Sequence, residues 1–266
     1  MTSRTYRAIA LVFVLLLGGR SSAGAYELLQ LDIKNGVYNG AAGLTLATSS
    51  AFTLYAYLTP PAGTSGKALE DLLSDTYYIA AALTPKVAVA SDLGSFTFNG
   101  STVRATQDMV YGVAPVERMG FSPQTSNVSD PGDMVSASIY DTYFKEFSFK
   151  FSKGTGTPRA TAYDVTTDNV SEPTPNANGG MYFASFAVDT AVLNPNYQVH
   201  FDLYSEKTTK KDVDINKFAP YAYSARSASL GGRFGLTAVP EPTSVALLGT
   251  GVAALVFHRR RAARRK

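Results

Sequence analysis

Aromatic and aliphatic residues at every second position constrain the fold of this chain more than any other feature. The run from Phe52 to Leu58 alternates in this way and stops at Pro60-Pro61. The same alternation recurs from Phe147 to Phe151 and from Tyr197 to Leu203. Because neighbouring side chains of a β-strand point to opposite faces, the pattern predicts strands that pack one face against a core.

Short strands also explain most of the remaining ordered sequence. Asn99-Gly100 is a dipeptide typical of a tight hairpin. Only Lys67 to Leu73 has the composition of a helix. We therefore predict an all-β fold, an antiparallel β-sandwich of jelly-roll-like form. The further strands that we expect are Leu28 to Ile33, Tyr77 to Leu83, Ser95 to Phe98 and Tyr182 to Val188.

The N-terminus has the three parts of a secretory signal peptide. Arg4 and Arg7 supply positive charge, Ala8 to Gly19 is apolar, and Ala23-Gly24-Ala25 fits an A-x-A cleavage site. The apolar stretch is too short for a retained membrane helix. We expect export by the Sec machinery and cleavage by signal peptidase after Ala25, so that residues 1–25 are removed.

The C-terminus combines a Pro-Glu-Pro sequence, a short apolar run and a basic tail. Pro240, Glu241 and Pro242 precede the uncharged stretch from Val245 to Phe257, and six Arg or Lys residues follow. At 1.5 Å per residue this stretch reaches about 20 Å as a helix, whereas the hydrocarbon core is roughly 30 Å thick. The basic tail would stay on the cytoplasmic side. This favours a short transmembrane helix that inserts only transiently.

These three parts, in this order, resemble the PEP-CTERM sorting signal of Gram-negative bacteria. The resemblance implies recognition of Pro240, Glu241 and Pro242 by an exosortase, a membrane-embedded cysteine protease. It also implies cleavage nearby and release to the cell surface or an exopolysaccharide matrix. The alternative is an ordinary tail anchor that contains Pro-Glu-Pro by chance. The expected organisation is a signal peptide at 1–25, a β-sandwich ectodomain at 26–224, a spacer at 225–238 and a sorting signal at 239–266.

Removal of both terminal segments changes the charge of the protein. The whole chain has 24 Lys and Arg and 21 Asp and Glu, and the two segments hold nine of the basic and one of the acidic residues. The remaining 15 basic and 20 acidic residues give the exported part a charge of −5. This excludes the basic footprint of a nucleic-acid-binding domain. The chain has no cysteine, so disulfides cannot hold it together.

A second resemblance lies in the predicted ectodomain. The blocks Asp141 to Phe149, Val199 to Tyr204 and Asp212 to Pro220 are similar to the choice-of-anchor class, in the order found in choice-of-anchor N. That resemblance implies a surface β-domain and brings no catalytic residue. Two other segments, Ser122 to Asp133 and Thr166 to Gly180, have loop composition. Each is either a plain connection or a long loop beside a ligand site.

Catalytic motifs are scarce in the exported part. Only His200 remains after processing, which rules out zinc sites built from Cys and His. A Ser-His-Asp triad would have to use His200, and the chain has no Gly-x-Ser-x-Gly sequence. Alternation places His200 on the polar side of its strand, so we interpret it as a surface histidine. We expect no enzyme activity, no catalytic residue and no bound organic cofactor.

Asp212, Asp214 and Asn216 form the best metal-binding candidate. Three oxygen-bearing side chains at alternate positions resemble the start of a calcium loop. However, Lys217 and Tyr223 stand where that loop has Gly and Glu. If Val213 and Ile215 face the core, alternation alone explains three outward polar residues. Calcium binding and a solvated strand face both remain open.

Together these features predict an exported protein that passes through the inner membrane and then reaches the cell surface or extracellular matrix. Its expected role is structural or adhesive, through contacts of exposed loops and tyrosines with exopolysaccharide. A carbohydrate-binding module, with or without calcium, is the first alternative. A polysaccharide hydrolase is the second, because twenty acidic residues always allow some pair of carboxylates across a groove.

Overall fold

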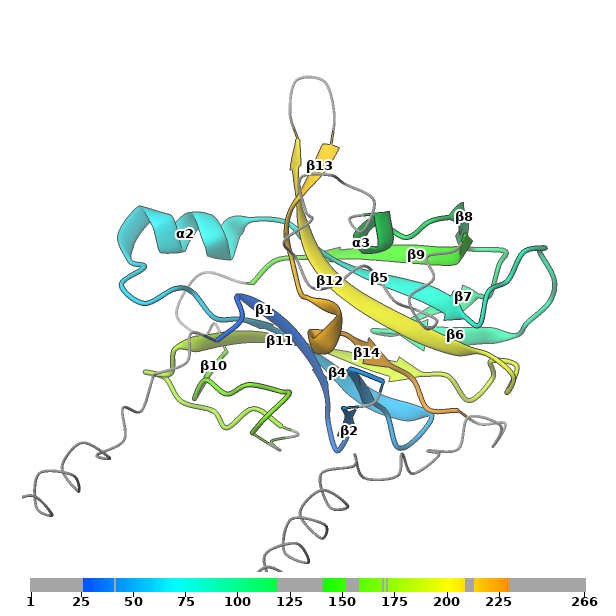
Figure 1. Cartoon of the computed structure of the whole chain (residues 1–266), viewed down its shortest axis with the longest axis horizontal. Helices are drawn as coiled ribbons and strands as arrows, with labels where there is room; N and C mark the ends of the chain where they lie inside the picture. Colours follow the sequence, from blue (N-terminus) through cyan, green and yellow to red (C-terminus); the bar gives the residue numbers. More distant parts are fainter. Residues whose placement is uncertain are drawn as a thin grey trace, which may run out of the picture.

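A computed structural model shows two β-sheets packed face to face (Figure 1). It describes residues 26–40, 42–118, 141–151, 158–168, 170, 172–208 and 213–229. All strand pairs are antiparallel in this part of the chain, except for one short parallel pair between β3 (Leu44–Leu46) and β14 (Ala225–Arg226). The predicted all-β antiparallel sandwich is confirmed. The predicted signal peptide and C-terminal helix lie outside the described residues.

The smaller sheet has six strands in the described part of the chain. Its central strand, β11 (Met181–Asp189), pairs with β4 (Ala51–Leu58) on one side and with β6 (Ser95–Phe98) on the other, and β6 pairs with the edge strand β7 (Ser101–Arg104). The strand order is β1 (Leu29–Ile33), β4 (Ala51–Leu58), β11 (Met181–Asp189), β6 (Ser95–Phe98) and β7 (Ser101–Arg104), with β10 (Arg159–Ala160) beside β11.

The larger sheet has eight strands among the described residues. Its longest strand, β12 (Gln198–Thr208), pairs with β5 (Tyr77–Thr84) over eight residues and extends together with β13 (Val213–Phe218) beyond the body of the sandwich (Figure 1). The order is β2 (Val37–Asn39), β3 (Leu44–Leu46), β14 (Ala225–Arg226), β12 (Gln198–Thr208), β5 (Tyr77–Thr84), β9 (Thr142–Phe149) and β8 (Val110–Gly112), with β13 (Val213–Phe218) beside β12.

One hydrophobic core fills the space between the sheets. Leu54 and Val188 from the smaller sheet and Ile79 and Leu203 from the larger sheet are all buried in it. Aromatic rings join the sheets directly: Phe98 of β6 stacks on Phe147 of β9 with ring centroids 4.0 Å apart. A fully buried apolar side chain contributes about 1.5–3 kcal/mol, so this core can stabilise a domain that has no disulfide.

The local sequence explains the main hairpin and helix. Asn99 and Gly100 have φ angles of 48° and 82°, the left-handed backbone that a two-residue turn between β6 and β7 requires. Helix α2 (Gly66–Ser74) buries Leu73 against the core. The short helices α3 (Pro115–Arg118) and η2 (Tyr221–Tyr223) complete the described elements. None of the helices in the described part is long and apolar enough to span a membrane.

The folded domain extends beyond the boundary that we predicted after residue 224. Ala225 is fully buried, and β14 pairs with both β12 and β3. The Ser227 hydroxyl accepts a hydrogen bond from the backbone N–H of Val199 at 2.9 Å. The first residues assigned to the spacer therefore close the larger sheet. Composition did not show this, because a two-residue strand is too short to produce a periodic pattern.

Candidate functional site

The outer face of the smaller sheet carries a buried aromatic cluster. On β4, Leu54 faces the core, whereas Tyr55 and Tyr57 face away from it. Tyr57 is nevertheless fully buried, because a segment around Tyr163 packs over it. The rings of Tyr57 and Tyr163 meet edge to face, with centroids 5.4 Å apart. The segment from Arg159 of β10 to Val165, called the covering segment below, therefore covers this end of the sheet.

A chain of hydrogen bonds links this cluster to Asp32 on β1. The oxygen atoms of Tyr57 and Tyr163 lie 2.6 Å apart, and the Tyr163 hydroxyl lies 2.7 Å from Asp32 Oδ2. One hydroxyl proton cannot serve both bonds. Tyr57 therefore donates to the Tyr163 oxygen, and Tyr163 donates to Asp32. The backbone N–H of Ile33 donates to Asp32 Oδ1 at 2.8 Å.

Gln30 fixes the covering segment onto β1. Its side-chain Nε2 donates to the carbonyl of Tyr163 at 3.2 Å, and its Oε1 accepts from the backbone N–H of Val165 at 3.1 Å. Gln30 is itself fully buried. Gln30 and Asp32 project from the same side of β1. Gln30 binds the backbone of the covering segment, and Asp32 binds the side chain of Tyr163 in that segment.

Burial dominates the electrostatics of this site. Desolvation raises the pKa of Asp32 from 3.8 to about 7, although the bonds from Tyr163 and Ile33 act in the opposite direction. Burial also raises the pKa of the Tyr57 and Tyr163 hydroxyls far above their usual range, with a further contribution from the nearby Asp32 charge. Both tyrosines remain protonated donors at any physiological pH. Asp32 changes its charge near neutrality.

Asp32 lies in the wall of a small cavity of about 180 Å³. The cavity separates β1 from the β2–β3 hairpin and from the covering segment. Its lining residues are Asp32, Gly36, Val37, Tyr38, Thr45, Val165 and Val170. It therefore combines one buried carboxyl group, one aromatic side chain and three valines.

A second, more open cleft of about 500 Å³ lies at the other end of the same sheet face. Lys34, Thr53, Thr97 and Asp189 contribute polar groups to it, whereas the ring of Phe52, another lining residue, packs on Phe201 in the core. Lys34 Nζ forms an ion pair with Glu172 at 2.9 Å, and Asp189 Oδ1 accepts from the N–H of Ala191 at 2.8 Å. Mixed hydroxyl, amide and charged groups suit a hydroxyl-rich ligand.

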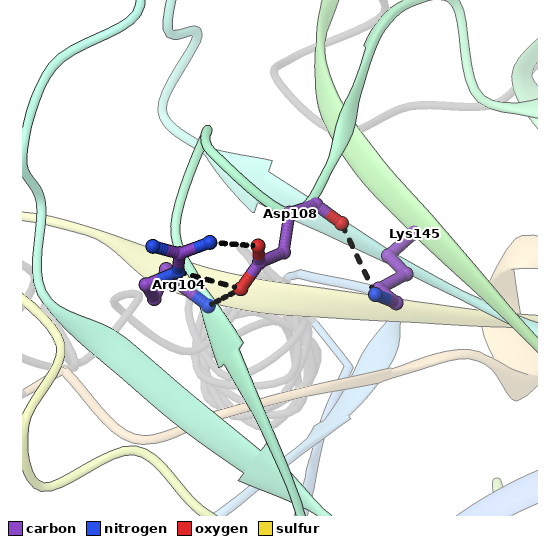
Figure 2. Close-up of polar contacts among 3 residues, drawn as sticks. All are labelled: Arg104, Asp108 and Lys145. Carbon is purple, nitrogen blue, oxygen red and sulfur yellow. Dashed lines mark hydrogen bonds and ion pairs between the residues drawn. The ribbon is translucent and has the colours of Figure 1, made fainter.

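An ion pair at the opposite edge of the sandwich has a different character (Figure 2). Arg104 contacts both carboxylate oxygens of Asp108, at 3.1 and 2.7 Å, and its backbone N–H donates to Asp108 Oδ2 at 2.8 Å. Lys145 of β9 donates to the Asp108 carbonyl at 3.2 Å. These bonds close the turn that leads from β7 in one sheet to β8 in the other. The Arg104 contacts lower the pKa of Asp108 to about 2.

The interpretation of His200 as a surface residue is wrong. His200 is fully buried on the outer face of β12, with Nε2 2.9 Å from Oδ1 of the buried Asp202. Alternation placed it on the correct side of the strand. That side is covered, however, because Ala114 and Val116 pack over the larger sheet. A sequence period shows which face a residue takes but not what covers that face.

The structure leaves the calcium prediction undecided. Asp212 lies outside the described residues, and so does the side chain of Asp214. Asn216 is exposed on β13, beside the irregularity in its pairing with β12. Among the residues that the structure describes, no three His, Cys, Asp or Glu side chains gather as a metal site.

The described tyrosines divide between the core and the surface, and the expectation that exposed ones bind a ligand stays a prediction. Tyr57, Tyr77, Tyr163 and Tyr204 are all buried. Tyr26 and Tyr111, each 43% exposed, lie at the surface. Tyrosine content alone did not distinguish core from surface. One sequence signal could have done so: the run from Phe52 to Leu58 has apolar or aromatic residues on both faces, which indicates a strand covered on both sides.

The remaining predicted site residues lie in the terminal segments. Ala23 and Ala25 at the expected signal-peptide cleavage site, and Pro240, Glu241 and Pro242 in the expected sorting signal, are outside the described residues. Sequence comparison tests the second group. Residues 238–261 match the PEP-CTERM protein-sorting motif.

This match confirms the predicted sorting signal. It marks the chain as a surface-sorted protein that is exported, passes through the membrane and is targeted to an exosortase. The match covers the C-terminal segment and not the sandwich. No curated protein matches the chain. The resemblance of the sandwich to the choice-of-anchor class, the signal-peptide cleavage site and the polysaccharide partner stay predictions.

Proposed function

We propose that the sandwich domain is a structural or adhesive protein of the cell surface or the exopolysaccharide matrix and that it catalyses no reaction. The observation that carries the proposal is the PEP-CTERM motif at residues 238–261, which follows the folded domain in the sequence. A cysteine-free domain with one continuous core between two sheets is a stable carrier for such a role.

Processing and location test the proposal in cells with and without the exosortase. The protein from wild-type cells should fractionate with surface or matrix material and have a mass below that of the full chain. Replacement of Pro240, Glu241 and Pro242 by alanine should leave a longer form in the membrane fraction. Replacement of the neighbouring Thr243 and Ser244 by alanine is the matched control and should be processed normally. Equal processing of both variants would contradict the assignment.

The absence of catalysis has its own test. The secreted form should stay bound to matrix polysaccharide through washing and should release no new reducing ends during prolonged incubation. Steady release of reducing ends, lost when a single carboxylate is changed to its amide, would instead favour the hydrolase alternative.

Glycan binding is a second candidate, and the open cleft of about 500 Å³ favours it. A binding module should give saturable signals on a glycan array. Asp189→Asn and Thr97→Val should weaken them, whereas Thr102→Val, at an exposed position on the neighbouring strand β7, should not. If calcium takes part, a chelator and the Asp212→Ala/Asp214→Ala variant should weaken binding equally.

A further inference from the structure

The Asp32 carboxyl group is buried without a cationic partner among the described residues. Its side chain accepts only from the Tyr163 hydroxyl and the Ile33 N–H. Lys34, the basic residue directly after β1, pairs with Glu172 at 2.9 Å instead. A buried carboxylate is costly unless it is paired, so a cation that reached this carboxylate would be strongly favoured.

Other groups around the cavity add negative rather than positive potential. The Asp164 carboxylate accepts from the Tyr223 hydroxyl at 3.1 Å. Burial raises the pKa of Tyr38 in the cavity wall, and the charge of Asp164 raises it further. The cavity is therefore lined by one carboxyl group and one aromatic ring, with the charge of Asp164 near that ring, and these surroundings attract an ammonium group.

The size and chemistry of the cavity narrow the class of cation. Pockets for drug-sized ligands occupy about 300–1,000 Å³, so 180 Å³ suits one ring or one chain end. Calcium takes six to eight oxygen ligands, and no cluster of three metal-ligating side chains occurs in the described part. Val37, Val165 and Val170 offer apolar contact that a hydrated metal ion would not use. An organic ammonium fits these surroundings better.

We propose that the cavity between β1, the β2–β3 hairpin and the segment around Val165 binds a primary ammonium group carried on a small ring or alkyl chain. The Asp32 carboxylate would accept hydrogen bonds from the ammonium, Tyr38 would face its positive charge, and the valines would contact the carbon skeleton. The site goes beyond the proposed function, and its test does not depend on sorting or adhesion.

The proposal predicts a pH dependence. The titratable groups that surround Asp32 are Tyr57, Tyr163 and Tyr55, which stay protonated in this range, together with Tyr38 at the cavity and Asp164 beside it. Asp32 is therefore the group that changes charge near pH 7. An alkylamine keeps its own charge between pH 6 and 8, so its affinity should rise about tenfold over that interval as Asp32 ionises.

Calorimetry on the secreted protein at pH 7 tests the ligand class with four compounds, because Asp32 is then about half ionised and glucosamine, a weaker base than an alkylamine, is still mostly protonated. Glucosamine and butylamine carry the ammonium group, whereas N-acetylglucosamine and glucose lack it. Both amines should bind, and the two neutral sugars should not. Tighter binding of glucosamine would identify an amino sugar as the source of the group, and tighter binding of butylamine would identify an alkyl chain end.

Two pairs of variants test the site itself. Asp32→Asn should weaken amine binding about tenfold or more, because it removes the charge and keeps the shape, and Asp108→Asn at the distant turn should leave it unchanged. Val37→Lys, at a half-exposed position in the cavity wall, should abolish binding by placing a competing ammonium there. Val192→Lys, at a well exposed position outside that wall, is its control.

Three results would overturn the proposal. They are equal binding of glucose and glucosamine, undiminished binding of amines by Asp32→Asn and Val37→Lys, and no heat with either amine at millimolar concentration. Circular dichroism and thermal unfolding of each variant would separate loss of the site from loss of the fold.

Discussion

Asp32 and Asp108 are the same residue type in opposite surroundings. Asp32 is buried beside two tyrosines, and its pKa is raised to about 7. Asp108 is partly exposed beside Arg104, and its pKa is lowered to about 2. Desolvation dominates at the first site, and a bidentate guanidinium dominates at the second (Figure 2).

The difference shows what each carboxyl group does. Asp108 closes a turn at the surface, where a paired charge adds little to stability and is screened by salt. Asp32 lies in the interior, where its charge opposes folding above neutral pH. A residue that opposes folding and lines a cavity is a better functional candidate than one that only closes a turn.

The largest expected effect is on the pH dependence of stability. The folded pKa of Asp32 lies above its ordinary value of 3.8, so the folded state holds this proton more tightly than the unfolded state. Its contribution to stability is therefore full below pH 4 and lost as the pH rises to 7. The total change is on the order of 4 kcal/mol. Denaturant unfolding at several pH values should show this decline in the wild type relative to Asp32→Asn. Parallel curves would contradict it.

Asp108 should show the opposite sign. Its folded pKa is below 3.8, so its contribution is present above pH 4 and lost as the pH falls toward 2. Acid unfolding of wild type and Asp108→Asn should therefore converge at low pH. One series of unfolding measurements over pH would then show opposite contributions to stability from Asp32 and Asp108.

Substitution of the middle tyrosine should have the next largest effect. Tyr163→Phe removes the donor to Asp32 and the acceptor for Tyr57, and it leaves two buried polar atoms, Asp32 Oδ2 and the Tyr57 hydroxyl oxygen, without partners. We expect a loss of about 2–3 kcal/mol in the free energy of unfolding. Tyr57→Phe removes only the terminal donor and should cost less than about 1 kcal/mol. Equal losses would show that the hydrogen bonds do not form the chain described above.

Thr45 provides a smaller test in the same cavity wall. Its hydroxyl is buried and has no hydrogen-bond partner among the described residues. Thr45→Val keeps the shape and removes this group, so it should raise the free energy of unfolding by up to about 1 kcal/mol. Thr142→Val is the control and should be destabilising, because that hydroxyl donates to the Leu83 carbonyl at 2.9 Å.

The surface ion pair should give the smallest effect. Arg104→Gln removes the bidentate contact but leaves the backbone bond to Asp108 in place. Thermal unfolding should shift slightly at low salt, and the shift should vanish at high salt. A large shift that does not depend on salt would mean that the pair behaves like a buried interaction.

Periodicity predicted the strands of this protein well. The runs from Phe52 to Leu58, from Tyr77 to Leu83 and from Tyr182 to Val188 correspond to β4, β5 and β11 within a residue or two. Asn99-Gly100 forms the predicted turn. These features are local, because turn chemistry and side-chain alternation act over a few residues.

The candidate site could not be predicted in the same way. Asp32 and Tyr163 are 131 positions apart in the chain, and neither is part of a recognisable motif. The burial of His200 and the pairing of Ala225 also depend on segments that are distant in sequence. Alternation assigns a face to each side chain, but only packing decides whether that face meets water.

The sequence by itself determined the destination of the protein and the type of its fold. A sorting motif is read as a linear segment, and a strand is defined by its own alternation. The tertiary structure alone decided which carboxyl group became buried and which cavity it lines. The reason is that a pKa depends on desolvation and on neighbouring charges, and both are set by residues brought together from distant parts of the chain.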